Sequence, residues 1–133
     1  MDNNIYLDHN ATSPLLPEAQ TAMNDAAEKS LGNPSSPHWA GRDAKVILEE
    51  ARNSLAKSLG AEPREIIFTS GGSESNNAVL RQLTVVSGKQ HIITSSIEHP
   101  SVLETSRILA EQPNISLTEL PVDSSGLINP ESL

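Results

Sequence analysis

Apolar side chains recur at every third or fourth position in one long stretch of the first half of the chain. Between Arg42 and Leu59 they form a single series: Ala44, Ile47, Leu48, Ala51, Leu55 and Leu59. Because an α-helix has about 3.6 residues per turn, this spacing places them on one face and predicts an amphipathic helix. Gly60 supplies a stop signal directly after it.

A shorter helix is predicted ahead of this one, opening at Pro17 and closed by Gly32. Proline suits the first helical position, where its missing N–H is not needed, and Glu18 complements the positive end of the helix dipole. The residues before it read as extended, because the short apolar run Ile5-Tyr6-Leu7 is followed by a cluster of turn formers.

The second half alternates compact apolar runs with helical periodicity. The predicted elements are strands and helices in turn, over residues 65–69, 75–86, 91–95, 100–112 and 115–122. Alternation of this kind is typical of an α/β fold with a mainly parallel sheet and flanking helices. We therefore expect residues 1–64 to form an N-terminal arm with helices, and residues 65–133 to begin an α/β domain.

The last residues carry the signals of a helix start. Asn129 suits the N-cap, Pro130 the first helical position and Glu131 the first turn. The sequence stops two residues after Glu131. A chain that opens a helix and then stops is expected to be cut rather than complete.

Composition and charge narrow the class of protein. Nine Lys and Arg against seventeen Asp and Glu give a formal charge of −8, which argues against a nucleic-acid or anionic-membrane surface. No apolar run exceeds three residues, which excludes a membrane helix and argues against a secretory signal, so a cytoplasmic location is expected. Without cysteine, the chain holds no disulfide, thiolate zinc site or cysteine nucleophile. Its histidines show no metal spacing, and no metal site is predicted.

The strongest candidate for chemistry is the glycine-rich turn at residues 69–74, between a predicted strand and a predicted helix. Unpaired N–H groups at a helix start, with the helix dipole behind them, favour a phosphate group. Gly72 lets the main chain approach an anion closely, and Ser73 adds a hydroxyl. The alternative is an ordinary strand-to-helix turn; the sequence matches neither a Walker A loop nor a full dinucleotide-binding fingerprint.

A second candidate is His99, just after the predicted strand at residues 91–95. Ligands of open α/β sheets lie beyond the carboxyl ends of the strands, so His99 and the glycine turn are expected to face one crevice. An imidazole there could stack on a flat ligand or move protons near neutral pH. The alternative is a solvated or helix-capping histidine. The polar loop at residues 33–38 is a third candidate, with a plain helix connector as its alternative.

Taken together, four ordered motifs resemble the cysteine desulfurases, which are pyridoxal-phosphate enzymes of the class V aminotransferase group with the aspartate-aminotransferase type fold (fold type I). The motifs are Tyr6-Leu7-Asp8-His9-Asn10-Ala11-Thr12-Ser13-Pro14, Gly32-Asn33-Pro34-Ser35-Ser36, Ile67-Phe68-Thr69-Ser70-Gly71-Gly72-Ser73-Glu74-Ser75-Asn76, and His91-Ile92-Ile93-Thr94-Ser95 with Glu98-His99. The likeness runs from Tyr6 to about Leu133, yet it covers well under half of the family's chain.

The resemblance implies roles for particular residues. Gly72 and Ser73 fall where the family binds the phosphate of pyridoxal 5'-phosphate; the family usually has Ala-Thr there, and Gly-Ser keeps the backbone donor and the hydroxyl. His99 falls on the histidine that stacks on the pyridine ring and helps to move protons. The segment Asn10-Ala11-Thr12 falls near the family's substrate entrance. Residues 65–133 would then be the start of the cofactor-binding large domain.

The resemblance also implies what the whole enzyme does. It would be a homodimer that converts cysteine to alanine and passes the sulfur on as a persulfide, to an acceptor or an iron–sulfur scaffold protein. The family's Schiff-base lysine, the carboxylate at the ring nitrogen and the persulfide cysteine lie farther along the chain, so these 133 residues alone are expected to be inactive. A related lyase, epimerase or aminotransferase such as a selenocysteine lyase, a non-catalytic remnant, and an unrelated phosphate-binding α/β module remain as alternatives.

Overall fold

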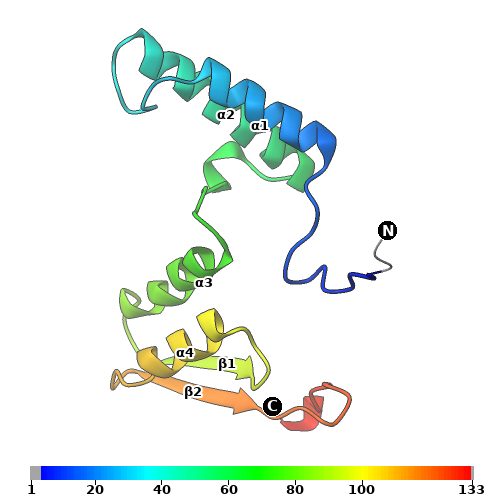
Figure 1. Cartoon of the computed structure of the whole chain (residues 1–133). Coiled ribbons are helices and arrows are strands. Elements are labelled where there is room, and N and C mark those ends of the chain that lie inside the picture. Colours follow the sequence, from blue (N-terminus) through cyan, green and yellow to red (C-terminus); the bar gives the residue numbers. More distant parts are fainter. Residues whose placement is uncertain (1–3, 133) are drawn as a thin grey trace. The chain divides into compact units, whose positions relative to one another are not determined.

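The structure of the chain is a computed structural model, and it describes residues 4–132. By its internal contacts the chain divides into two compact units, Met1–Ile67 and Phe68–Leu133. The first unit is built from helices and the second from alternating helices and strands (Figure 1).

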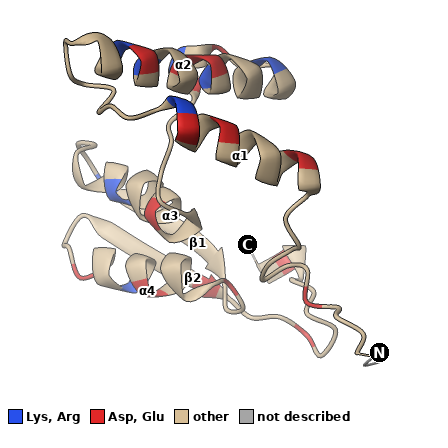
Figure 2. Cartoon of the chain, turned by 45° about the horizontal axis from the view of Figure 1, so that its top comes forward, with Lys and Arg blue, Asp and Glu red and all other residues tan. Residues whose placement is uncertain are grey.

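The first unit holds two helices, α1 (Pro17–Lys29) and α2 (Trp39–Leu59), and a short 3-10 turn at Pro63–Glu65. α2 begins at Trp39 rather than at the predicted Arg42, because His38 caps it: its Nδ1 accepts the N–H of Gly41 at 3.4 Å. Gly60 ends the helix in the left-handed conformation, with φ of 67°. α1 carries acidic residues with a single lysine at its C-terminal end, whereas α2 carries residues of both signs along its length (Figure 2).

The loop at residues 32–38 lies directly against the first turn of α2. A Cβ on Gly41 would lie 2.3 Å from the Ser36 carbonyl oxygen, and a Cβ on Gly32 would lie 2.2 Å from that of Ala40. The Arg42 guanidinium also donates to the Pro37 carbonyl oxygen at 2.6 Å. Two glycines therefore allow an approach that any side chain would block, and this loop is a tightly packed helix connector.

The second unit alternates helices with strands. Its elements in order are α3 (Gly72–Arg81), a 3-10 turn at Gln82–Thr84, β1 (Gln90–Ser95), α4 (Pro100–Leu109), β2 (Ile115–Leu120) and a 3-10 turn at Pro130–Ser132. β1 and β2 pair in parallel, from Gln90 opposite Ile115 to Ser95 opposite Leu120. The mixed α/β architecture with a parallel sheet is thus confirmed, with two strands among the described residues.

The prediction of a strand over residues 65–69 is wrong. Glu65 belongs to the 3-10 turn, where its carboxylate accepts the N–H of Glu62 at 2.7 Å. The residues after it are extended, but no described strand forms a β-ladder with them. A strand needs a neighbour for its backbone hydrogen bonds, so apolar content alone does not make this segment one. Ile67 consequently stays 81% exposed.

The core of the second unit lies on one face of the two-stranded sheet. Ile92, Ile115 and Leu109 are buried, and the side chains packed against them are Leu80, Leu83 and Leu117. Side chains alternate between faces along a strand, so the parallel register puts Ile92, Ile115 and Leu117 on the same face. Residues of α3, its 3-10 extension and α4 cover that face.

No helix in the part of the chain that the structure describes is long and apolar enough to cross a membrane.

Candidate functional site

The entrance to α3 leaves backbone donors free. Gly71 is the N-cap and has no side chain with which to cap the helix. The N–H groups of Gly72 and Ser73 make no hydrogen bond within the described residues, as expected for the first turn of a helix. A Cβ built on Gly71 or Gly72 would meet no atom within 4 Å. Neither a close neighbouring atom nor a positive φ therefore requires glycine at these two positions. The space beside the turn is open to a ligand.

Side chains on both sides of the glycines hold the turn in place. The Glu74 carboxylate accepts from the Ser70 N–H at 2.7 Å and from the Ser70 hydroxyl at 2.6 Å. The hydroxyls of Thr69 and Ser75 lie 2.7 Å apart across the same turn. The bonds from the Ser70 hydroxyl and N–H lower the pKa of Glu74, so its negative charge is held at Ser70.

His99 caps α4 at its N-terminus. Its Nδ1 accepts the N–H of Ser101 at 3.1 Å and lies 2.8 Å from the Ser101 hydroxyl. Pro100 fills the first helical position, where its lack of an N–H costs nothing. The capping role that the sequence offered as an alternative is therefore real, and it leaves the Nε2 side of the ring uncommitted.

Two asparagines of α3 join it to α4. Asn76 Nδ2 donates to the Ser101 hydroxyl at 2.9 Å, and the Thr105 hydroxyl donates to Asn77 Oδ1 at 3.2 Å. The contacts advance in the same direction along both helices, so their N-termini lie at the same end. Two partly positive helix ends, one bearing the glycine turn and one bearing His99, are thereby brought together.

These residues form one open pocket of about 240 Å³. Its lining consists of Gly72, Ser73, Asn76, His99 and Ser101. The structure thus brings together three predicted site residues, Gly72, Ser73 and His99. Among residues 4–132, no lysine, arginine or carboxylate lines the pocket, so an anion there would be met by N–H groups, hydroxyls and helix dipoles.

Sequence reasoning missed Asn76 and Ser101. A signal existed for Asn76, which stands four residues after Gly72 and therefore on the same face of α3. No local signal distinguishes Ser101 from the other serines of the chain. Its contribution depends on the docking of α4 against α3.

The predicted segment Asn10-Ala11-Thr12 belongs to the first unit. It lies in an exposed turn in which the N–H groups of Ala11 and Thr12 donate to the Asp8 carbonyl oxygen at 3.2 and 3.4 Å. The Tyr6 hydroxyl donates to the same oxygen at 2.8 Å. The segment is therefore locally ordered by hydrogen bonds of its own.

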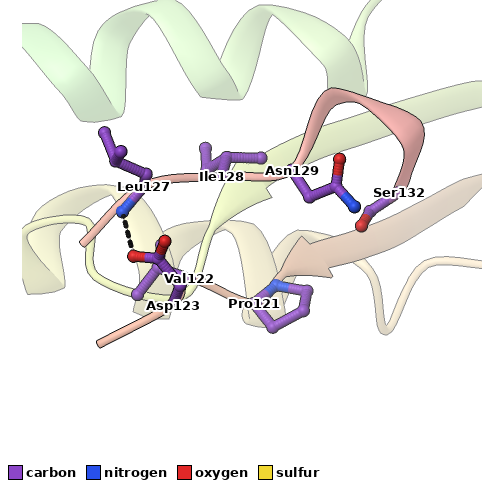
Figure 3. A pocket seen from close by; sticks show the side chains of 7 residues that line it. All are labelled: Pro121, Val122, Asp123, Leu127, Ile128, Asn129 and Ser132. Carbon is purple, nitrogen blue, oxygen red and sulfur yellow. Dashed lines mark hydrogen bonds between the residues drawn. The ribbon is translucent and has the colours of Figure 1, made fainter. Parts of the chain in front are cut away.

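A larger pocket, of about 410 Å³, contains none of the predicted site residues (Figure 3). Its lining is Pro121, Val122, Asp123, Leu127, Ile128, Asn129 and Ser132. The one carboxylate there, on Asp123, accepts the N–H groups of Ser125 and Leu127, and these bonds lower its pKa. This pocket is larger than the one at Gly72 and His99, but its Asp123 carboxylate already accepts the hydrogen bonds that close a turn. The pocket at Gly72 and His99 is therefore the better candidate for a ligand site. The described residues contain no cluster that could hold a metal ion.

Comparison with known proteins identifies the family to which the chain belongs. Residues 5–133 match the model of the family described as aminotransferase class-V, which covers nearly the whole chain. The chain therefore belongs to the class-V aminotransferase family. This confirms the family resemblance drawn from the ordered motifs.

Within that family the chain is related to cysteine desulfurases and selenocysteine lyases. It is 45% identical to the cysteine desulfurase IscS of Dictyoglomus turgidum, over 100% of this chain and 34% of that protein. It is 42% identical to the selenocysteine lyase of Homo sapiens, over 91% of this chain and 32% of that protein. The apo structure of a cysteine desulfurase from Thermococcus onnurineus matches with a TM-score of 0.79 and 30% identity, over 94% of this chain and 32% of that one. The chain thus spans about a third of the length of the relatives it matches.

Proposed function

We propose that this chain supplies the phosphate-binding and ring-stacking part of a pyridoxal-phosphate-dependent cysteine desulfurase. The observation that carries the proposal is the single pocket in which Gly72 and Ser73 at the start of α3 meet His99 at the start of α4. The class-V aminotransferase family uses pyridoxal 5'-phosphate. The cofactor is a flat ring with a dianionic phosphate arm, and the pocket lining combines unbonded N–H groups at a helix start with an imidazole ring.

In this proposal the phosphate is held at the N-terminus of α3. The N–H groups of Gly72 and Ser73 donate to its oxygens, and the Ser73 hydroxyl adds a third donor. The carboxylate of Glu74 is hydrogen-bonded to Ser70 and is not among the residues that line the pocket, which supports a phosphate there. Because the pocket has no lysine or arginine, the helix dipoles of α3 and α4 provide the balancing positive potential.

His99 stacks on the cofactor ring in this proposal, and it holds or moves a proton at Nε2, the ring nitrogen that the cap leaves uncommitted. When bound, the cofactor supplies the electron sink that makes bond cleavage at the substrate's α-carbon and β-carbon accessible. The substrate would be cysteine and the products alanine and sulfur, the latter passed as a persulfide to an acceptor or iron–sulfur scaffold protein.

The remaining parts of the proposal concern the whole enzyme. It would act as a cytoplasmic homodimer, with residues 1–64 as an arm and residues 65–133 as the start of the cofactor-binding domain. Asn10, Ala11 and Thr12 would lie near the substrate entrance. The second candidate is a selenocysteine lyase, favoured by the 42% identity to the human enzyme of that name. Alanine release from cysteine and from selenocysteine, compared in an enzyme that contains this chain, separates the two.

The test is binding of pyridoxal 5'-phosphate to the 133-residue chain and to three variants. Ser73→Ala removes one hydrogen bond to a charged group, so the affinity should fall about tenfold or more. His99→Asn removes the ring but keeps a side chain that caps helices well, so the affinity should fall while α4 stays folded.

Ser116→Ala is the matched control for the binding experiment. Ser116 is an exposed serine of β2 outside the pocket, so its loss should leave the affinity unchanged. Equal affinity in the parent, Ser73→Ala and Ser116→Ala proteins would rule out the phosphate site at this turn. Circular dichroism of each variant verifies that the fold is retained.

A further inference from the structure

The Nδ1 atom of His99 receives two contacts from a single residue. The Ser101 N–H, at 3.1 Å, can only donate, so Nδ1 must accept and cannot carry a proton of its own. The Ser101 hydroxyl lies 2.8 Å from the same nitrogen and can donate or accept. The direction of that second bond depends on what holds the hydroxyl on its other side.

Asn76 decides this direction. Its Nδ2 donates to the Ser101 oxygen at 2.9 Å, which occupies a lone pair and turns the hydroxyl proton toward His99. In the hydrogen-bonded series Asn76–Ser101–His99, each bond therefore has one defined donor and one defined acceptor. Both Ser101 groups then donate to Nδ1, and the single proton of a neutral imidazole lies on Nε2.

A second capping histidine shows that this arrangement exceeds what a helix cap needs. His38 caps α2 through Nδ1 as well, with the Gly41 N–H at 3.4 Å. Among the described residues no side-chain hydroxyl or amide bonds to the His38 ring. The hydroxyl of Ser101 and the amide of Asn76 are additions found at the histidine that lines the pocket.

We infer that Asn76 and Ser101 are positioning residues that fix neutral His99 in the tautomer with its proton on Nε2, so that this histidine faces its ligand as a proton donor. The identity of that ligand rests on the proposed function, whereas the tautomer does not. His99 then differs from a base, which would need Nε2 free of a proton. In this inference Asn76 and Ser101 act on the ligand through His99.

The experiment is nuclear magnetic resonance of the full chain with 15N-labelled histidine, without cofactor. At about pH 8 an ordinary histidine, with a pKa of about 6.5, is neutral, and two-bond 1H–15N correlations distinguish the tautomers. The spectrum of His99 is assigned by its loss in the His99→Asn variant. The parent protein should hold His99 in the Nε2–H form.

Three variants separate positioning from packing. Ser101→Ala removes one bond to Nδ1 and should shift the tautomer ratio of His99 toward Nδ1–H about fivefold, the change expected for one ordinary hydrogen bond. Asn76→Ala frees the hydroxyl to turn and should shift the ratio in the same direction by a smaller factor. Thr105→Val breaks the neighbouring bond between α4 and α3 but removes no hydrogen bond among Asn76, Ser101 and His99. It should therefore leave the tautomer ratio of His99 unchanged.

The signals of His38 and His91 in the same spectra serve as internal controls and should not move. A parent protein with His99 in the Nδ1–H form would overturn the inference, as would a ratio that ignores both Ser101→Ala and Asn76→Ala. A shift of equal size in Thr105→Val would also overturn it, since loosened helix packing would then explain the effect. Failure to bind pyridoxal 5'-phosphate with the tautomer pattern intact would instead contradict only the proposed function.

Discussion

Thr105 and Ser106 are consecutive buried residues of α4 with opposite hydrogen-bonding states. The Thr105 hydroxyl donates to Asn77 Oδ1 at 3.2 Å, whereas the fully buried Ser106 hydroxyl has no partner among the described residues. An unpaired buried hydroxyl has lost its water without compensation, so it contributes no hydrogen-bond stability and carries a desolvation cost.

This contrast gives the first prediction. Ser106→Ala should leave the free energy of unfolding unchanged or raise it by about 1 kcal/mol, while Thr105→Val should lower it by about 1 kcal/mol. Urea denaturation followed by circular dichroism measures both variants against the parent. A loss in Ser106→Ala as large as that in Thr105→Val would mean that the Ser106 hydroxyl has a partner in solution.

A second prediction compares two glycines in the first turns of helices. In Gly41→Ala the new Cβ would lie 2.3 Å from the Ser36 carbonyl oxygen, so the variant should lose about 1–3 kcal/mol despite alanine's better helix propensity. In Gly72→Ala the Cβ meets nothing within 4 Å, so stability should stay equal or rise. Thermal unfolding of both variants tests this, and equal melting temperatures would contradict the close packing of the loop on α2.

At the scale of the elements, an ion pair between Arg107 and Glu119 links α4 to β2. The Arg107 guanidinium binds both carboxylate oxygens of Glu119 at 2.7 Å and also contacts Glu104 at 2.7 Å. The hydrogen bonds from Arg107 lower the pKa of Glu119 below its usual value of 4.5. These groups lie at the surface, so salt screens their attraction.

The third prediction follows from the sign of that pKa shift. Since the folded state lowers the pKa of Glu119, its stabilising effect is present at neutral pH and is lost as the pH falls below about 4.5. Glu119→Gln should therefore be less stable than the parent at pH 7, and the difference should shrink at pH 3. Denaturation at both pH values in low salt measures it.

Glu111→Gln is the control for this experiment, because Glu111 forms no ion pair among the described residues. Its stability should stay close to that of the parent protein at both pH values. A constant difference between Glu119→Gln and the parent across the pH range would show that Arg107 does not act on an ionised Glu119.

The helix predicted at residues 75–86 shows how far apolar periodicity predicts which side chains are buried. The apolar spacing in the helix predicted at residues 75–86 places Ala78, Val79, Leu83 and Val86 on one side, yet Val79 and Val86 are 71% and 48% exposed. Of the four, Leu83 does pack on the core, and Leu80 packs beside it. The helix ends at Arg81 and continues as a 3-10 turn, which changes the angular spacing of the last residues. A period of about 3.6 therefore describes only part of this segment.

At the scale of the whole chain, the pocket offers no group for covalent attachment of an aldehyde. Its five lining residues include no lysine. The fourth prediction is that the chain binds pyridoxal 5'-phosphate reversibly: dialysis should remove it, and borohydride should not fix it to the protein. Cofactor fixed at low concentration to Lys29, Lys45, Lys57 or Lys89, as located by peptide mass spectrometry, would contradict this.

The sequence by itself determined the features that depend on near neighbours along the chain. The helix opened by Pro17, the long amphipathic helix closed by Gly60 and the strand at residues 91–95 are confirmed within a few residues. Periodicity, caps and breakers act over a single turn, so they can be read locally. The turn at Gly72 and Ser73 and the histidine at position 99 were also visible as ordered motifs, although their roles stay predictions.

Only the tertiary structure decided the features that depend on residues far apart in the sequence. Residues 65–69 needed a partner strand that the described chain does not give them. Asn76 and Ser101 stand 25 residues apart and meet only because α3 docks alongside α4. The hydrogen bond between them, whose Ser101 oxygen also lies next to Nδ1 of His99, is a property of the packed helices. A hydrogen bond requires its two atoms within about 3 Å of each other, and no local pattern of residues specifies such a distance across a fold.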